Sequence, residues 1–197
     1  MNHSHRYFII NKPYNMVSQF ISTDKVKLLG ELDFVFPEGI HAIGRLDSNS
    51  EGLLLLTTNK KITRLLFSSG IPHKRVYLVQ VNNIISQDSL EKLRTGVSIR
   101  IKTGECYITP PCDVKPVEDP ALFCNWAAIN KEYGAHTWLL ITLTEGKFRQ
   151  VRKMIAAVKH RCKRLIRISI EDLHLDKLQP GEVKELEENV FFEKLNI

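Results

Sequence analysis

The sequence lacks the patterns that metal centres, disulfide scaffolds and membrane proteins require. Its four cysteines form no CxxC pair, its seven histidines form no HExxH motif, and no His/Cys cluster has the spacing of metal ligands. The longest unbroken apolar run is residues 154–158, far below the ~18 residues needed to cross a bilayer. We therefore expect no metal, no membrane partner and reduced cysteines that serve as packing residues.

Targeting and disorder signals are also absent. The first residues, MNHSHRYF, do not follow the basic–apolar–small order of a signal peptide, which predicts a cytoplasmic protein. The 197 residues are 43% hydrophobic and 25% charged, a composition typical of globular chains. We expect one domain over 1–197, with two lobes as the alternative.

Positive charge is concentrated in one segment. The chain has a net charge of +6, but residues 145–167 contain nine Lys/Arg and a single acidic residue, a local charge of +8. The rest of the chain therefore carries −2. A basic segment of this kind, which ends at Arg167, indicates a polyanionic partner, with nucleic acid favoured over an anionic membrane.

Hydrophobic periodicity predicts an α+β fold. Strand and helix patterns alternate without a regular βαβ order, which favours a mixed, largely antiparallel sheet with flanking helices. The apolar run 53–56 predicts a strand buried on both faces, and Ser86 predicts a helix cap. The expected strands are 6–11, 40–43, 53–56, 75–81, 137–144 and 164–170, the helices 24–34, 60–67, 86–93 and 148–159, and the β-rich middle 97–130.

The segment GRLDSNSEGLLLLTTN, residues 44–59, joins a polar turn to the buried strand. A turn anchored in this way can present Asp47 rigidly at the mouth of a cleft. The alternative is a polar hairpin in which the aspartate only caps its own backbone, and the pattern alone favours that alternative.

The segment LTEGKFRQVRKM, residues 143–154, predicts a helix with an apolar face that includes Phe148. Arg149 and Lys153 would lie on the opposite face, and Arg152 at the border between core and solvent. A guanidinium at such a border can pair with a carboxylate and hold it ionised. A solvated basic helix face is the alternative.

Two further segments carry single candidates. Tyr77 lies in the predicted strand KRVYLVQV, where a tyrosine most often serves packing. Lys12 lies in NKPYNMVSQF, at the end of the first strand, and composition does not decide whether it is catalytic, structural or solvated.

Together, in this order and over about residues 8–186, the four segments resemble the motifs of the pseudouridine synthases related to the enzyme of small-subunit 16S rRNA. The resemblance implies a catalytic domain with a central RNA-binding cleft. It also implies that Asp47 is the essential carboxylate, that Arg152 pairs with it, and that Tyr77 stacks on the detached uracil. These are the three catalytic candidates.

The resemblance implies that Lys12, Arg45, Arg149 and Lys153 bind RNA, Arg45 by helping to displace the base from its stack. It implies no metal and no cofactor, because breaking and rejoining the glycosidic bond needs neither. The same residues leave one rival in another class, a non-catalytic rRNA-binding or assembly protein on this fold.

Within the family, the chain is most similar to the E-type branch that modifies large-subunit 23S rRNA. Two features support this placement: the motif NKPYNMVSQF, and the lack of room for an S4-type domain before it. We expect a monomer with ribosomal RNA as its partner. The alternative substrates are 16S rRNA and tRNA.

Overall fold

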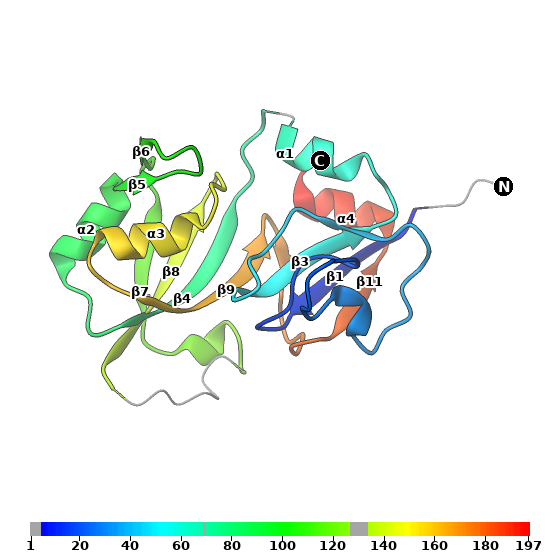
Figure 1. Cartoon of the computed structure of the whole chain (residues 1–197), viewed down its shortest axis with the longest axis horizontal. Coiled ribbons are helices and arrows are strands. Elements are labelled where there is room, and N and C mark those ends of the chain that lie inside the picture. Colours follow the sequence, from blue (N-terminus) through cyan, green and yellow to red (C-terminus); the bar gives the residue numbers. More distant parts are fainter. Residues whose placement is uncertain (1–4, 69, 127–133) are drawn as a thin grey trace. The chain divides into compact units, whose positions relative to one another are not determined.

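The computed structural model describes residues 5–68, 70–126 and 134–197 (Figure 1). The chain divides into two compact units, one formed by Met1–His73 with Arg167–Ile197 and the other by Lys74–Ile166. We call them unit 1 and unit 2 and describe each by itself.

Unit 1 contains the first and last elements of the chain. In chain order they are β1 (Tyr7–Lys12), η1 (Leu29–Glu31), β2 (His41–Ile43), β3 (Glu51–Thr57), α1 (Ile62–Ser68), the end of β9 (Cys162–Ile170), β10 (Leu173–His174), β11 (Val183–Leu186) and α4 (Glu188–Leu195).

The strands of unit 1 are organised around β1. It pairs antiparallel with β3 on one side and with β11 on the other, while β2 pairs antiparallel with β3 (Figure 1). All six residues of β1 are buried because both of its faces are covered. Phe8 and Ile10 join a core cluster with Leu54 and Leu56, and the ring of Tyr7 lies 4.8 Å from that of Phe191 in α4.

The apolar run 53–56 is buried as the sequence predicts. Each of its four leucines is 0% exposed, because β3 packs on both faces within unit 1. The polar turn that precedes this strand is therefore attached to a fully buried, closely packed element.

Unit 2 contains the remaining elements. They are β4 (Arg75–Asn82), α2 (Gln87–Thr95), β5 (Ser98–Arg100), β6 (Cys106–Ile108), β7 (Asp113–Val117), η2 (Pro120–Leu122), β8 (His136–Leu143), α3 (Gln150–Ala157) and the beginning of β9.

The sheet of unit 2 is antiparallel, with β8 between β4 and β7. One face carries α2 and α3, whose residues Leu93 and Met154 join a core cluster with Val79 and Leu139 (Figure 1). The hairpin β5–β6 forms a separate two-stranded sheet. Antiparallel pairs with helices on a sheet face confirm the α+β prediction.

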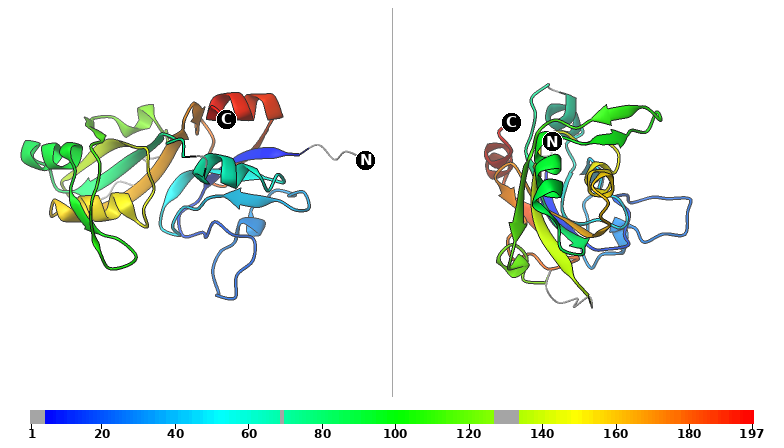
Figure 2. Two further views of the ribbon diagram at one scale, coloured as in Figure 1. Left: turned by 90° about the horizontal axis from the view of Figure 1, so that it is seen from above. Right: turned by 90° about the vertical axis from the view of Figure 1, so that its left-hand side faces the viewer.

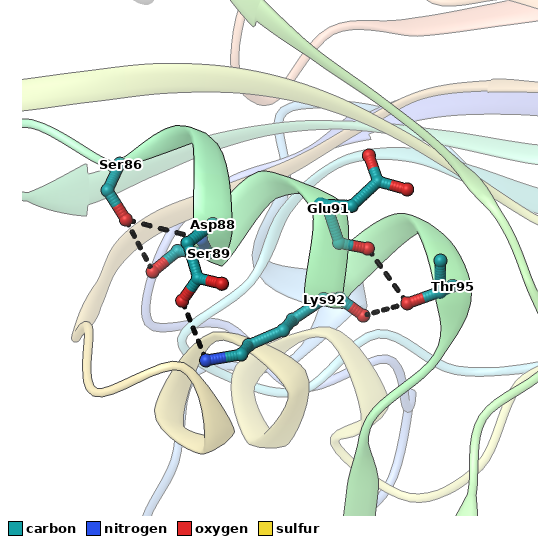
Figure 3. Close-up of polar contacts among 6 residues, drawn as sticks. All are labelled: Ser86, Asp88, Ser89, Glu91, Lys92 and Thr95. Atoms are coloured by element: carbon teal, nitrogen blue, oxygen red, sulfur yellow. Dashed lines mark hydrogen bonds and ion pairs between the residues drawn. The ribbon is translucent and has the colours of Figure 1, made fainter.

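Helix α2 begins where the sequence predicts (Figure 3). The Ser86 hydroxyl accepts a hydrogen bond from the backbone N–H of Ser89 at 3.2 Å, and Lys92 pairs with Asp88 one turn earlier at 2.7 Å. The helix ends at Gly96, whose φ of 115° only glycine adopts readily.

The predicted helix 24–34 is wrong. Only the short η1 forms there, and Figure 2 shows the preceding segment, in blue, extending away from β1 in both views. Besides short local turns, the backbone of this segment bonds to residues before it: Val17 N–H donates to Lys27 O at 3.0 Å, and Leu29 N–H to Gln19 O at 2.9 Å. These tertiary bonds override a helix-like apolar spacing.

The start of helix α3 and the C-terminal part of the chain also differ from the prediction. Helix α3 begins at Gln150, so Phe148 precedes it and is 57% exposed instead of lying on the apolar face. The β-rich segment 97–130 contains β5, β6 and β7, and its last part, 127–130, lies outside the described residues. The C-terminal β10, β11 and α4 were not predicted.

The cysteines are all free. Cys124 is buried and Cys112 and Cys162 are partly buried, as expected of packing residues, whereas Cys106 is exposed. Across 5–68, 70–126 and 134–197, no helix has the length and apolarity to span a membrane.

Candidate functional site

Asp47 lies in the turn between β2 and β3 and is partly buried. Its backbone carbonyl accepts a hydrogen bond from Ser50 N–H at 3.0 Å, which closes the turn. The preceding residue, Leu46, is 8% exposed and belongs to the core cluster of unit 1. The carboxylate is therefore carried by a short turn with a buried residue on its N-terminal side and a buried strand after it.

Gly52, the second residue of β3, has a backbone conformation that other residues rarely adopt. Its φ is 100°, and a Cβ placed there would lie 2.3 Å from the carbonyl oxygen of Arg167 in β9. The turn therefore enters β3 through a backbone contact that leaves no space for a side chain.

Lys12 is fully buried beside the turn, at 0% exposure. Its ammonium donates hydrogen bonds to three backbone carbonyls, those of Met16 at 2.6 Å, Pro13 at 2.8 Å and Ser48 at 3.4 Å. Ser48 directly follows Asp47. This burial favours the structural alternative for Lys12, and its contact with RNA stays a prediction.

Burial lowers the pKa of Lys12 from 10.5 to about 8. The charges of Glu51 and Asp47 act in the opposite direction, and that of Arg167 lowers the pKa further. Lys12 therefore stays protonated at neutral pH and contributes positive charge near the Asp47 carboxylate.

The burial of two charged residues of unit 1 was not predicted from the sequence. Glu51 is 6% exposed at the start of β3, and Arg167 is 4% exposed in β9, where its Nε–H donates to Leu53 O at 2.8 Å. Arg167 therefore does not belong to a basic surface, although the charge count included it. Glu51 falls within the motif that carries Asp47, and a carboxylate two residues before a buried apolar run was the available signal.

Arg45 lies two residues before Asp47 and is exposed. In unit 1 the turn between β2 and β3 thus carries Arg45 and Asp47, and the end of β1 beside it carries Lys12.

Tyr77 lies in β4 opposite Ile141 of β8 and is 9% exposed. It belongs to the core cluster of unit 2 together with Val151 and Ile155 of α3. Its strand and its helix neighbours fix its position firmly, which agrees with a packing role and with the rigid support that a stacking residue requires.

Helix α3 has the two faces that the sequence predicts, except that Phe148 and Arg149 precede it. Val151, Met154 and Ile155 are buried, whereas Arg152 and Lys153 are partly buried.

The cations of α3 have different partners. Arg152 Nη1–H donates to Cys162 O at 3.3 Å. Lys153 Nζ donates to Arg100 O of β5 at 2.6 Å and lies 5.2 Å from the centre of the Phe148 ring. Arg152 is thus oriented by the segment after the helix, and Lys153 by the hairpin β5–β6.

The segment before α3 is held by a carboxylate. Glu145 accepts hydrogen bonds from the Tyr107 hydroxyl and from the Gln150 side chain, both at 2.6 Å, and Gln150 in turn accepts one from Lys147 N–H at 2.8 Å. These contacts support the left-handed backbone of Arg149, which has a φ of 54° and an exposed side chain. The sequence reasoning missed this network because Tyr107 is far away in the chain.

The candidates thus form two groups. Unit 1 carries Asp47, Arg45 and Lys12. Unit 2 carries Tyr77, Arg152 and Lys153 of α3, and Arg149 directly before that helix. Within the described part of the chain, no three His, Cys, Asp or Glu residues form a group that could hold a metal ion.

Comparison with known proteins gives a consistent result. A family described as RNA pseudouridylate synthase matches residues 6–157. The ribosomal large subunit pseudouridine synthase E of Vibrio parahaemolyticus is 36% identical over 183 residues, which are 92% of this chain and 74% of that protein.

Two further similarities are to a relative named for the small ribosomal subunit and to a solved structure. The ribosomal small subunit pseudouridine synthase A of Yersinia pestis is 30% identical over 182 residues, covering 92% of this chain and 69% of that protein. A crystal structure of a pseudouridylate synthase superimposes with a TM-score of 0.77 at 27% identity, covering 98% of this chain and 74% of that one.

Proposed function

Since the chain belongs to the RNA pseudouridylate synthase family, we propose that it isomerises a uridine of 23S ribosomal RNA to pseudouridine, with Asp47 as the essential carboxylate. The 36% identity to a large-subunit synthase over 183 residues is the observation that carries the substrate. The small-subunit relative, at 30%, leaves 16S rRNA as the second candidate.

The reaction breaks the bond between N1 of uracil and C1′ of ribose, turns the base and forms a bond from C5 to C1′. The C5 hydrogen leaves as a proton, and N1 ends with a hydrogen of its own, so that no redox partner is needed. Asp47 can attack the sugar, add to the base or remove a ribose proton, and each route uses the ionised carboxylate.

The turn around Asp47 is suited to this role because it holds the carboxylate in place. Ser50 closes the turn, and the buried ammonium of Lys12 bonds to the carbonyl of Ser48, the next residue. We therefore propose that Lys12 supports this turn. A prearranged carboxylate needs no reorganisation at the moment of reaction.

The other roles follow from the family resemblance. Arg152 would pair with Asp47 and hold it ionised, and Tyr77 would stack on the detached uracil. Arg45 would help to displace the uridine from its stack, and Arg149 and Lys153 would contact phosphates. The exposure of Arg45 and Arg149 supports their RNA contacts. The RNA-binding cleft stays a prediction, as do a monomeric state and a cytoplasmic location.

The test is carbodiimide–primer extension mapping of rRNA from cells that lack the gene. We expect one 23S stop to disappear and to return with the wild-type gene but not with Asp47→Ala. Asp33→Ala, which changes an exposed aspartate of the same unit, is the matched control and should restore the stop.

Each other outcome has a distinct meaning. Loss of a 16S or tRNA stop instead would move the substrate and keep the chemistry. Persistence of every pseudouridine in the deletion strain would rule out the large-subunit assignment. Full rescue of an assembly defect by Asp47→Ala would favour a non-catalytic binding protein.

A further inference from the structure

Ser18 lies in the segment between β1 and η1, far from Asp47 in the chain, and touches the catalytic turn. It is 6% exposed. Its hydroxyl donates a hydrogen bond to Leu46 O at 3.0 Å and accepts one from Leu46 N–H, also at 3.0 Å. One side chain therefore binds both polar groups of the residue that directly precedes Asp47.

The backbone around Ser18 is itself fixed. On one side Val17 N–H donates to Lys27 O at 3.0 Å, and on the other Leu29 N–H donates to Gln19 O at 2.9 Å. Ser18 is thus held on both flanks and can act as a fixed point for the turn.

The surroundings of this contact are apolar. Leu46 shares a core cluster with Met16 and Leu29, which are 5% and 0% exposed. Water does not readily replace a hydrogen bond that is lost in such a place, so the backbone of Leu46 would have to move to find new partners. A rotation there would be passed through one peptide bond to the Asp47 carboxylate.

We propose that Ser18 is a positioning residue for Asp47, fixing the backbone of Leu46 so that the carboxylate meets the uridine in its productive geometry. The inference rests on the proposed function, because it takes Asp47 as the catalytic carboxylate. With Lys12 on Ser48, the turn is then held on both sides of Asp47.

The test compares Ser18→Ala with Ser22→Ala under single-turnover conditions. Ser22 is the matched control because its hydroxyl also accepts a backbone hydrogen bond at 3.0 Å, but from Asp24 N–H and not from Leu46. The rate is measured as tritium release from a 23S rRNA transcript labelled at C5 of uridine, since the reaction expels that hydrogen. RNA affinity is measured by filter binding on the same preparations.

We expect Ser18→Ala to lower the single-turnover rate about tenfold to a hundredfold, because a small misplacement of a reacting group has an effect of this order. The affinity for RNA should stay within about threefold of the wild type, since nucleic-acid affinity comes mainly from phosphate contacts made elsewhere. Ser22→Ala should change neither quantity, and Ser18→Thr, which keeps the hydroxyl, should restore most of the rate.

A wild-type rate in Ser18→Ala would overturn the inference, and so would an equal loss of rate in Ser22→Ala. If Ser18→Ala does not fold, Ser18→Cys decides, because a thiol is a weak partner of similar size. A slow rate with normal RNA affinity supports the inference, and a normal rate overturns it. Asp47→Ala is assayed in parallel: if it keeps full activity, the proposed function fails, whatever Ser18 does.

Discussion

A buried ammonium among backbone carbonyls makes the stability of unit 1 depend on pH. Lys12 has a pKa of about 8 in the folded chain and 10.5 as its ordinary value, because burial penalises its charged form. Between these two values the unfolded chain binds more protons than the folded one, so stability rises with pH. Below about 8 both states are protonated, and the penalty is complete.

We predict that the free energy of unfolding rises by roughly 2 kcal/mol more in the wild type than in Lys12→Met between about pH 7.5 and about pH 9.5. Urea unfolding of both proteins at the two pH values measures this difference. Equal slopes in the two proteins would show that Lys12 has an ordinary pKa. Lys25→Met, which removes an exposed lysine of the same unit, should behave like the wild type.

Adjacent cations of α3 should have separable effects. Arg152→Ala should lower the rate at least about tenfold with little change in RNA affinity, if Arg152 holds Asp47 ionised. Lys153→Ala should weaken RNA binding several-fold and change the single-turnover rate less. Single-turnover kinetics and filter binding measure both quantities, and equal effects of the two changes on binding alone would count against the ion pair.

Among the elements, the junction between the Asp47 turn and β3 has no space for an added side chain. Gly52→Ala introduces a methyl group 2.3 Å from the Arg167 carbonyl oxygen at a φ of 100°, so backbone must move. We predict a loss of more than about 2 kcal/mol of unfolding free energy, measured by urea denaturation.

Gly39 provides the matched control for that change. Its φ is 76°, but no atom lies within 4 Å of the position a Cβ would take. Gly39→Ala should therefore cost only the left-handed backbone strain, about 1 kcal/mol. If both changes cost the same, conformational strain and not the contact with β9 governs Gly52.

The elements that the sequence predicted well are those with local causes. Ser86 caps α2 by accepting a hydrogen bond from the N–H of Ser89, three residues later. The leucines of 53–56 are buried in β3, as expected of a purely apolar run. Segment 24–34 has helix-like spacing, but its backbone pairs with residues 16–19, and no local pattern encodes such a pairing.

In the candidate site, too, only the features with local causes could be predicted from the sequence. The motif located Asp47 and its turn, but the partners of that turn come from other parts of the chain. Ser18 and Lys12 lie in a segment whose composition suits a loop or a solvated turn equally well, and only the fold buries both beside Leu46 and Ser48. The start of α3 was misplaced because Glu145 and Tyr107 fix it through their side chains.

At the scale of the whole molecule, charge separates between the two units. Unit 2 contains 16 Lys/Arg and 8 Asp/Glu residues, whereas unit 1 contains 12 and 14, so the positive excess belongs to unit 2 alone. Phosphate contacts release counterions, and RNA affinity should therefore fall with salt in proportion to the cations that unit 2 provides.

We predict that replacing Lys159 and Arg161 of unit 2 by glutamine reduces the slope of log affinity against log salt by about 1.4 if both contact single-stranded RNA. The same change at Lys60 and Lys61 of unit 1 should leave the slope almost unchanged, although all four side chains are exposed. Filter binding across a salt series measures the slopes. Equal reductions in both variants would show that RNA covers the two units alike.

The pairing of β1 with β11 also has a consequence for the order in which the protein can fold during synthesis. Arg6 and Glu185 extend this pairing through a 2.6 Å ion pair, although they are 179 positions apart in the sequence. In the sequence, all of unit 2 lies between the two parts of unit 1. A ribosome therefore delivers all of unit 2 before it delivers the last strand of unit 1. Until then β1 lacks one of its two neighbours, and the unit that carries Asp47 is the last to be completed.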